Sequence, residues 1–162
     1  MPDQDGFKVT PWTVEGEVDY NKLVQEFGTQ LITDELLERI KKHTGDLHQF
    51  LRLKYFFSHR DLSWLLDRYE NGEKFYLYTG RGPSGSIHFG HLMPWTFTKY
   101  IQDKFDSKLL FQLTDDEKFL YHSETSMDKI SKYTYENILD IIAVGFNPKN
   151  TKILIDTKHI RH

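Results

Sequence analysis

Residues 74–119 read KFYLYTGRGPSGSIHFGHLMPWTFTKYIQDKFDSKLLFQLTDDEKF, and they place two short apolar runs on either side of a segment of helical length. The segment 92–105 has helical apolar spacing, and a second helical pattern at 125–144 leads to a third apolar run, TKILID at 151–156. This strand–helix–strand–helix–strand order predicts an α/β protein with a parallel sheet and right-handed crossovers. Ligands are then expected beyond the carboxyl ends of the strands.

The first 72 residues differ, because they have the spacing of short helices. We predict helices at 20–27, ending at Gly28, and from Thr33 as N-cap to Gly45. A third is predicted from Ser58, whose spacing to Asp61 matches a capping box, to the Asn71-Gly72 stop. Thr125 and Asp128 are a second predicted capping box. The domain prediction is therefore an N-terminal helical region, 1–72, and a sheet region, 73–162.

Composition limits the function classes. The 162 residues have a formal net charge of −3, so no global basic field gathers nucleic acid. The chain has no Cys, which removes thiolate nucleophiles and thiolate metal sites. We find no apolar signal region and no run long enough to span a bilayer, so we expect a cytoplasmic protein.

The glycine-rich segment 78–91, YTGRGPSGSIHFGH, connects the first strand to the first helix. Gly80, Gly82, Gly85 and Gly90 let the backbone approach a bulky anion, and the helix start supplies free N–H groups, which together indicate a phosphate. The segment is neither G-x-G-x-x-G nor G-x-x-x-x-G-K-[ST]. Glycine, proline and serine also form ordinary turns, which is the alternative interpretation.

His88 and His91 lie three residues apart at this helix start, so both imidazoles are expected on one face. As donors they would stabilise charge on a phosphoryl group. The alternatives are a zinc pair, which needs a third ligand, and two structural histidines.

The second polar segment is QLTDDEKF, 112–119, at the end of the next strand. Its acids are explained by a solvated helix start. Alternatively, one of the three carboxylates there holds a ligand ammonium or Mg²⁺, and Lys118 meets a phosphate.

These segments resemble the tryptophanyl-tRNA synthetases of the archaeal and eukaryotic type. HFGH at 88–91 is similar to the His-x-Gly-His signature of class I aminoacyl-tRNA synthetases. The resemblance extends over TPWTVEG (10–16), DYNKL (19–23), FFSHRD (56–61), YTGRGPSG (78–85), TDDEKF (114–119) and DIIAVGF (140–146).

The resemblance implies ATP-dependent activation of L-tryptophan to tryptophanyl-AMP, with Mg²⁺, and transfer to tRNA(Trp) by a homodimer. It implies three groups of residues: catalytic His88, His91 and Lys118; ATP-binding Gly80, Arg81, Gly82, His88, Gly90, His91 and Lys118; and tryptophan-binding Tyr78, Gln112 and Glu117. It also suggests a lid over the ATP site around Trp12, for which an anchoring core aromatic is the alternative.

The chain departs from the family after Asp156, where no string resembling Lys-Met-Ser-Ala-Ser follows. We therefore expect the first half of a Rossmann-like catalytic domain, the N-terminal part of the enzyme. The alternative is a catalytically incomplete binding or regulatory fragment.

Overall fold

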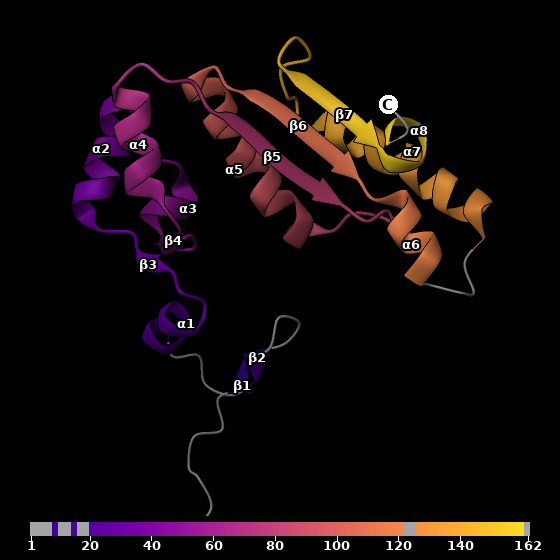
Figure 1. Cartoon of the computed structure of the whole chain (residues 1–162), viewed down its shortest axis with the longest axis horizontal. Helices are drawn as coiled ribbons and strands as arrows, with labels where there is room; N and C mark the ends of the chain where they lie inside the picture. Colours follow the sequence, from indigo (N-terminus) through magenta and orange to yellow (C-terminus); the bar gives the residue numbers. More distant parts are fainter. Residues whose placement is uncertain (1–7, 10–13, 16–19, 122–125, 161–162) are drawn as a thin grey trace, which may run out of the picture. The chain divides into compact units, whose positions relative to one another are not determined.

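The computed structural model describes residues 8–9, 14–15, 20–121 and 126–160 (Figure 1). The chain divides into two compact units, Met1–Asp67 and Arg68–His162. Trp12 lies outside the described residues, so the lid interpretation stays a prediction. Among the described residues, no helix is long and apolar enough to cross a membrane.

The N-terminal unit is built from short elements. In order they are β1 (Lys8–Val9), β2 (Val14–Glu15), α1 (Tyr20–Glu26), β3 (Gln30–Leu31), α2 (Asp34–Thr44), α3 (Gln49–Arg52) and β4 (Ser58–His59), with α4 (Leu62–Glu70) running across the unit boundary. β1 pairs with β2 and β3 with β4, both antiparallel.

The predicted ends of α2 are confirmed. The Thr33 side chain accepts a hydrogen bond from the N–H of Leu36, and Gly45 follows the helix with a φ of 81°. Acidic side chains lie in the first turn of α2 and basic side chains in its last turn, which suits the helix dipole.

The predicted capping box at Ser58 is wrong. Ser58 belongs to β4, where it pairs with Leu31, and the helix begins four residues later at Leu62. The N–H of Leu62 donates to Nδ1 of His59 at 3.1 Å, so a histidine ring takes the capping role expected of serine. The predicted stop after this helix is correct, since Gly72 has a φ of 87°.

The second unit contains a three-stranded parallel sheet in the order β5-β6-β7. Its elements are β5 (Tyr76–Arg81), α5 (Phe89–Phe105), β6 (Lys108–Leu113), α6 (Asp115–Tyr121), α7 (Met127–Ala143), β7 (Thr151–Ile155) and α8 (Asp156–His159). The predicted α/β class and order of elements are confirmed. All three strand arrows in Figure 1 point toward the edge where α6 lies.

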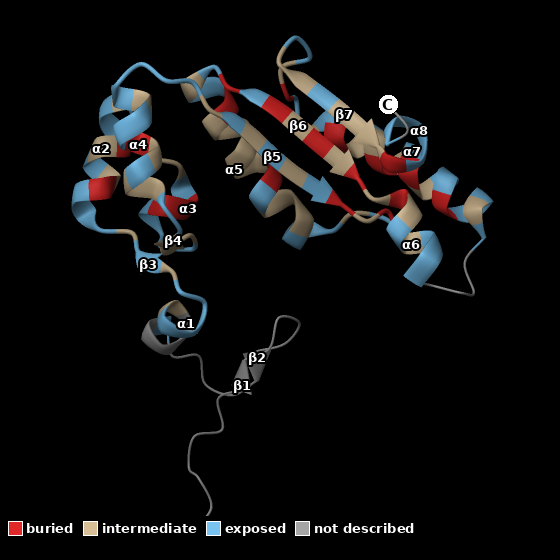
Figure 2. Cartoon of the chain, viewed as in Figure 1, coloured by how far each residue is buried: buried red, intermediate tan, exposed pale blue. Residues whose placement is uncertain are grey.

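Alternation along β6 divides the sheet into a covered and an open face. Leu109, Phe111 and Leu113 are buried with Trp95 of α5 and Ile141 of α7 in one apolar core (Figure 2). The rings of Trp95 and Phe111 meet edge to face, with centroids 5.2 Å apart. The other face carries Tyr76 and Tyr78, whose exposed fractions are 72% and 62%.

The start of α7 differs from the prediction. Its N-cap is Ser126, whose side chain accepts from the N–H of Lys129; the predicted cap, Thr125, lies outside the described residues. The acidic segment after β6 forms a separate helix, α6, which precedes α7. The predicted end is correct, since α7 stops at Ala143 and Gly145 has a φ of 85°.

Candidate functional site

Side chains from β5 and α7 hold the glycine-rich loop between β5 and α5 by hydrogen bonds to its backbone. Arg81, the last residue of β5, is buried, and its Nη2 donates to the carbonyl oxygens of Gly85 and Ser86 at 3.0 and 3.1 Å. Nδ2 of Asn137 in α7 also donates to the Gly85 oxygen, at 3.0 Å. Arg81 was predicted as a site residue; Asn137 was missed.

Three polar atoms of this fastening have no hydrogen-bond partner among the described residues: Nε and Nη1 of Arg81 and Oδ1 of Asn137. Burial lowers the pKa of Arg81, and the nearby Asp140 carboxylate opposes this effect. A buried cation with unpaired donors gains from an additional anion or acceptor. The buried guanidinium of Arg81 therefore favours binding of a negatively charged group at this loop.

The two predicted histidines lie together at the start of α5. Their ring centroids are 3.8 Å apart, and Nδ1 of His91 accepts from the backbone N–H of His88 at 3.3 Å. Burial lowers the pKa of His91, and the positive charge of Arg81 lowers it further. A neutral His91 that accepts at Nδ1 carries its proton on Nε2, where it acts as a donor.

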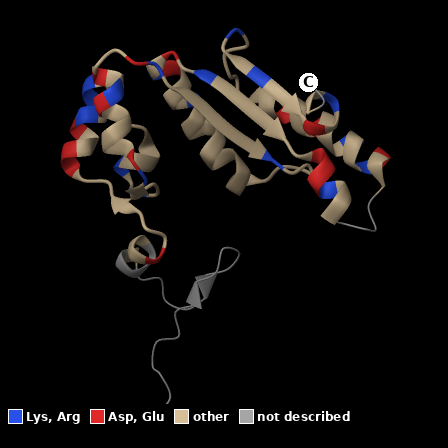
Figure 3. Cartoon of the chain, viewed as in Figure 1, with Lys and Arg blue, Asp and Glu red and all other residues tan. Residues whose placement is uncertain are grey.

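Gly82 and Lys118 bring the loop and α6 into contact. A Cβ added to Gly82 would overlap Cε of Lys118, so the lysine stem lies directly against the glycine backbone. Oε1 of Glu117 lies 4.0 Å from Nζ of Lys118, and its Oε2 accepts from Thr114 at 2.9 Å. Acidic side chains gather in the first turn of α6 (Figure 3).

On the open face, Tyr78 and Gln112 meet. Gln112 is opposite Gly80 in the sheet register, so it lies on the same face as Tyr78, and the Tyr78 hydroxyl donates to its Oε1. Nε2 of Gln112 donates to both carboxylate oxygens of Asp156, each at 2.8 Å. Glu117 bonds to Thr114 instead of contacting this pair.

Two buried carboxylates at the same edge were not anticipated as site residues. Asp115 accepts from the N–H of Thr157 at 3.0 Å and from its hydroxyl at 2.5 Å, which ties α6 to α8. Burial raises the pKa of Asp156, its bond from Gln112 opposes the rise, and the neighbouring carboxylate of Asp116 adds to it. An acid placed directly after a strand is the sequence signal that would have identified Asp156.

The described residues contain no group of three or more His, Cys, Asp or Glu side chains arranged to hold a metal ion. His88 and His91 therefore have no third ligand of these types in the described parts of the chain. The acids of α6 likewise form no such group.

The family model described as tRNA synthetases class I (W and Y) matches residues 70–162. The chain belongs to this family. The match begins in α4 and includes every residue of the candidate site.

This class I synthetase chain has close relatives over its full length. A protein named tryptophan–tRNA ligase from Saccharolobus solfataricus is 54% identical over 162 residues, which cover 100% of this chain and 42% of the relative. The protein of the same name from Pyrococcus furiosus is 54% identical over 93% of this chain and 39% of its own length. The chain thus spans about two fifths of these relatives.

Solved structures agree with this class I assignment. The tryptophanyl-tRNA synthetase of Plasmodium falciparum has a TM-score of 0.86 and 48% identity, covering 89% of this chain and 42% of the other. That of Trypanosoma brucei has a TM-score of 0.84 and 51% identity, covering 88% and 44%.

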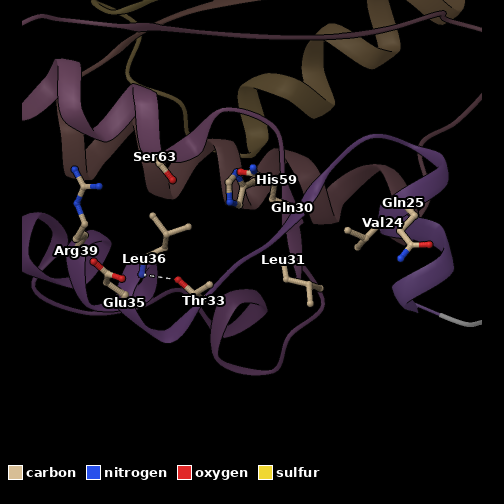
Figure 4. Close-up of a pocket in the computed structure, with 10 residues that line it drawn as sticks. All are labelled: Val24, Gln25, Gln30, Leu31, Thr33, Glu35, Leu36, Arg39, His59 and Ser63. Carbon is tan, nitrogen blue, oxygen red and sulfur yellow. Dashed lines mark hydrogen bonds between the residues drawn. The ribbon is translucent and has the colours of Figure 1, made fainter.

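A cavity of about 740 Å³ lies within the N-terminal unit of this class I synthetase chain, and none of the predicted site residues lines it (Figure 4). Its walls are formed by Val24, Gln25, Gln30, Leu31, Thr33, Glu35, Leu36, Arg39, His59 and Ser63. Several of its polar groups are already engaged: Arg39 pairs with Asp67 at 2.7 Å, and Thr33 caps α2.

Proposed function

We propose that this chain carries the amino-acid activation site of a tryptophan–tRNA ligase, which forms tryptophanyl-AMP from L-tryptophan and ATP before transfer to tRNA(Trp). One observation carries the proposal: Tyr78 and Gln112 form a hydrogen-bonded pair on the sheet face, at the edge where the glycine-rich loop begins. The indole N–H is only a donor, and Oε1 of Gln112 is an acceptor. The names of the close relatives support the same substrate.

The proposed tryptophan site consists of Tyr78, Gln112 and Glu117. Oε1 of Gln112 accepts one hydrogen bond from Tyr78 and has a second lone pair, to which the indole N–H donates. A phenylalanine side chain has no donor for this second lone pair, so the binding of phenylalanine is disfavoured. Glu117 leaves Thr114 on substrate binding and accepts from the α-ammonium, a stronger charge-assisted bond.

The proposed ATP site consists of Gly80, Arg81, Gly82, Gly90 and Lys118, with His88 and His91. Gly82 leaves room for the Lys118 stem beside the loop backbone, and His91 donates from Nε2. Lys118 adds a positive charge beside Gly82. Arg81 contributes its charge and holds the loop through the Gly85 and Ser86 carbonyls.

The reaction is an in-line displacement at phosphorus. A carboxylate oxygen of tryptophan bonds to the α-phosphorus of ATP as the bond to pyrophosphate breaks, and the electron pair leaves with pyrophosphate. The protein's part is to orient the two substrates and to neutralise charge on the phosphoryl oxygens. The catalytic assignments are His88, His91 and Lys118.

Mg²⁺ is proposed only as the ion that accompanies ATP. The described residues hold no cluster of three or more His, Cys, Asp or Glu side chains that could hold a metal ion. Magnesium in such sites keeps its waters and is bound largely through substrate phosphates. We therefore assign no step to a protein-held metal.

The remaining assignments rest on family membership. We propose that the protein acts in the cytoplasm as a homodimer on tRNA(Trp), with residues 73–162 contributing the first half of the catalytic domain and residues 1–72 an N-terminal helical region with a lid. Light scattering of the purified protein tests the dimer.

ATP–pyrophosphate exchange tests the activity. We expect exchange that requires tryptophan and not tyrosine, and a raised KM for tryptophan in Glu117→Ala. Glu136→Ala is the matched control, because this acid lies on α7 and pairs with Lys132 at 3.9 Å. Tyrosine-dependent exchange would contradict the proposal.

The second candidate function is binding of tryptophan or its adenylate without turnover. Calorimetric titration with a non-hydrolysable tryptophanyl-adenylate analogue separates the two. Binding without exchange supports this second function. Absence of both contradicts both candidates.

A further inference from the structure

Asp156 lies where β7 ends and α8 begins, beside the proposed indole site. In the sheet register Gln112 is opposite Leu154, and Asp156 follows Leu154 by two residues, directly beyond the end of β7. Asp156 is 6% exposed, and both of its carboxylate oxygens lie 2.8 Å from Nε2 of Gln112. Besides Gln112, its carboxyl group has Asp116 as a side-chain hydrogen-bond partner.

The contact fixes which end of the Gln112 amide faces the open side. A primary amide has a donor end and an acceptor end, whereas a carboxylate only accepts. Nε2 must therefore face Asp156, and Oε1 must face Tyr78, whose hydroxyl donates to it. The reversed amide would set Oε1 against two carboxylate oxygens and present a donor to the pocket.

Protonation of Asp156 does not remove this constraint. Burial raises the pKa of Asp156, and the carboxylates that face it, Asp115 and Asp116 of α6, favour the protonated form as well. A protonated carboxyl retains an acceptor oxygen, and both oxygens are within reach of Nε2. The amide therefore keeps its direction in either state.

We propose that Asp156 is a positioning residue that selects the indole N–H, by holding Gln112 with its carbonyl oxygen toward the substrate. The inference rests on the proposed function, because it assigns the tryptophan side chain to this site. Asp156 does not touch the substrate. Its effect is on the choice between a ring that donates a hydrogen bond and one that does not.

The test compares L-tryptophan with 3-benzothienyl-L-alanine, which has a sulfur in place of the indole N–H, by calorimetric titration of the full chain. The wild type should prefer tryptophan. Asp156→Leu frees the amide to rotate, so the preference should fall by about 2- to 10-fold, the equivalent of one net hydrogen bond. Asp156→Asn retains one acceptor oxygen and should recover much of the preference.

A second measurement needs no variant and no ligand. In NMR spectra of the wild-type chain, the side-chain amide protons of Gln112 should shift with the titration of the Asp156 carboxyl, while the amide of exposed Gln25 should not. Gln112 amide protons that ignore this titration would overturn the proposal, as would an Asp156→Leu variant with unchanged preference.

The two failures are distinguishable. A wild type that binds neither amino acid, or does not distinguish them, contradicts the proposed function, and the NMR titration still decides the role of Asp156. An equal preference for tryptophan in the wild type and in the Asp156→Leu variant contradicts only the inference.

Discussion

Replacing Gly80 by alanine tests whether β5 and β6 pack closely at Gly80, beside the candidate site. Gly80 is opposite Gln112, and an added Cβ would lie 2.8 Å from the Gln112 carbonyl oxygen. That oxygen belongs to a strand backbone between two hydrogen-bonded neighbours, so it has no rotamer by which to move away. The strands must separate, or Gly80 must shift.

The expected cost is that of overpacking a tight contact, about 1 to 3 kcal/mol. In a protein of this size each kcal/mol lowers Tm by about 2 to 4 °C, so Gly80→Ala should melt about 2 to 12 °C below the wild type. The same shift moves Gln112 relative to Tyr78 and should weaken tryptophan binding.

Thermal unfolding followed by circular dichroism measures the effect, with Gly85→Ala as the matched control. Gly85 has no atom within 4 Å of an added Cβ and no positive φ. Its alanine variant should therefore match the wild type or exceed it by about 0.4 to 1 kcal/mol, since alanine restricts the unfolded chain. Equal Tm values for Gly80→Ala and the wild type would refute the reasoning.

Three further predictions concern the same unit. The pKa of His91 in the folded protein is lowered by burial and by Arg81. Between this lowered pKa and the ordinary value of about 6.5, the unfolded chain binds more protons than the folded chain, so the folded state should lose stability as pH falls through that window. An NMR titration midpoint of His91 at or above 6.5 would contradict this. Phe111→Ala, at a position with 0% exposure, should cost about 3 to 5 kcal/mol in urea unfolding, and a cost below 1 kcal/mol would show that the core is not centred there. Asp115→Ala leaves the N–H and hydroxyl of Thr157 without their acceptor, so it should cost about 1 to 3 kcal/mol and speed hydrogen exchange at the Thr157 amide; unchanged exchange would argue against the α6–α8 link.

Long periodic segments were predictable because local residues determine them. Thr33 and Gly45 mark the ends of α2, and the apolar runs at 74–80, 108–116 and 151–156 each overlap a strand of the sheet. Two-residue strands such as β4 have no period to detect, so the sequence alone does not distinguish Ser58 in a strand from Ser58 as a helix cap.

The candidate site was predictable only in part, for a different reason. Tyr78 and Gln112 followed from the family resemblance, and their position at the sheet edge followed from the order of elements. Asp156 acts on a residue 44 positions away, and Asn137 on one 52 positions away, so no local motif contains either contact. Asn137 left a weak signal, since it lies on the buried face of α7 with Ile141.

The hold of Arg81 on two successive carbonyls has a geometric consequence for the loop. A trans peptide directs its C=O and N–H to opposite sides, and the described chain has no cis peptide. Because the Gly85 and Ser86 oxygens turn toward the guanidinium, the N–H groups of Ser86 and Ile87 turn away from it. By binding these two carbonyl oxygens, Arg81 fixes the orientation of two peptide groups whose N–H donors point away from it. Replacing Arg81 by an uncharged residue would therefore alter the direction of these backbone donors as well as the local charge.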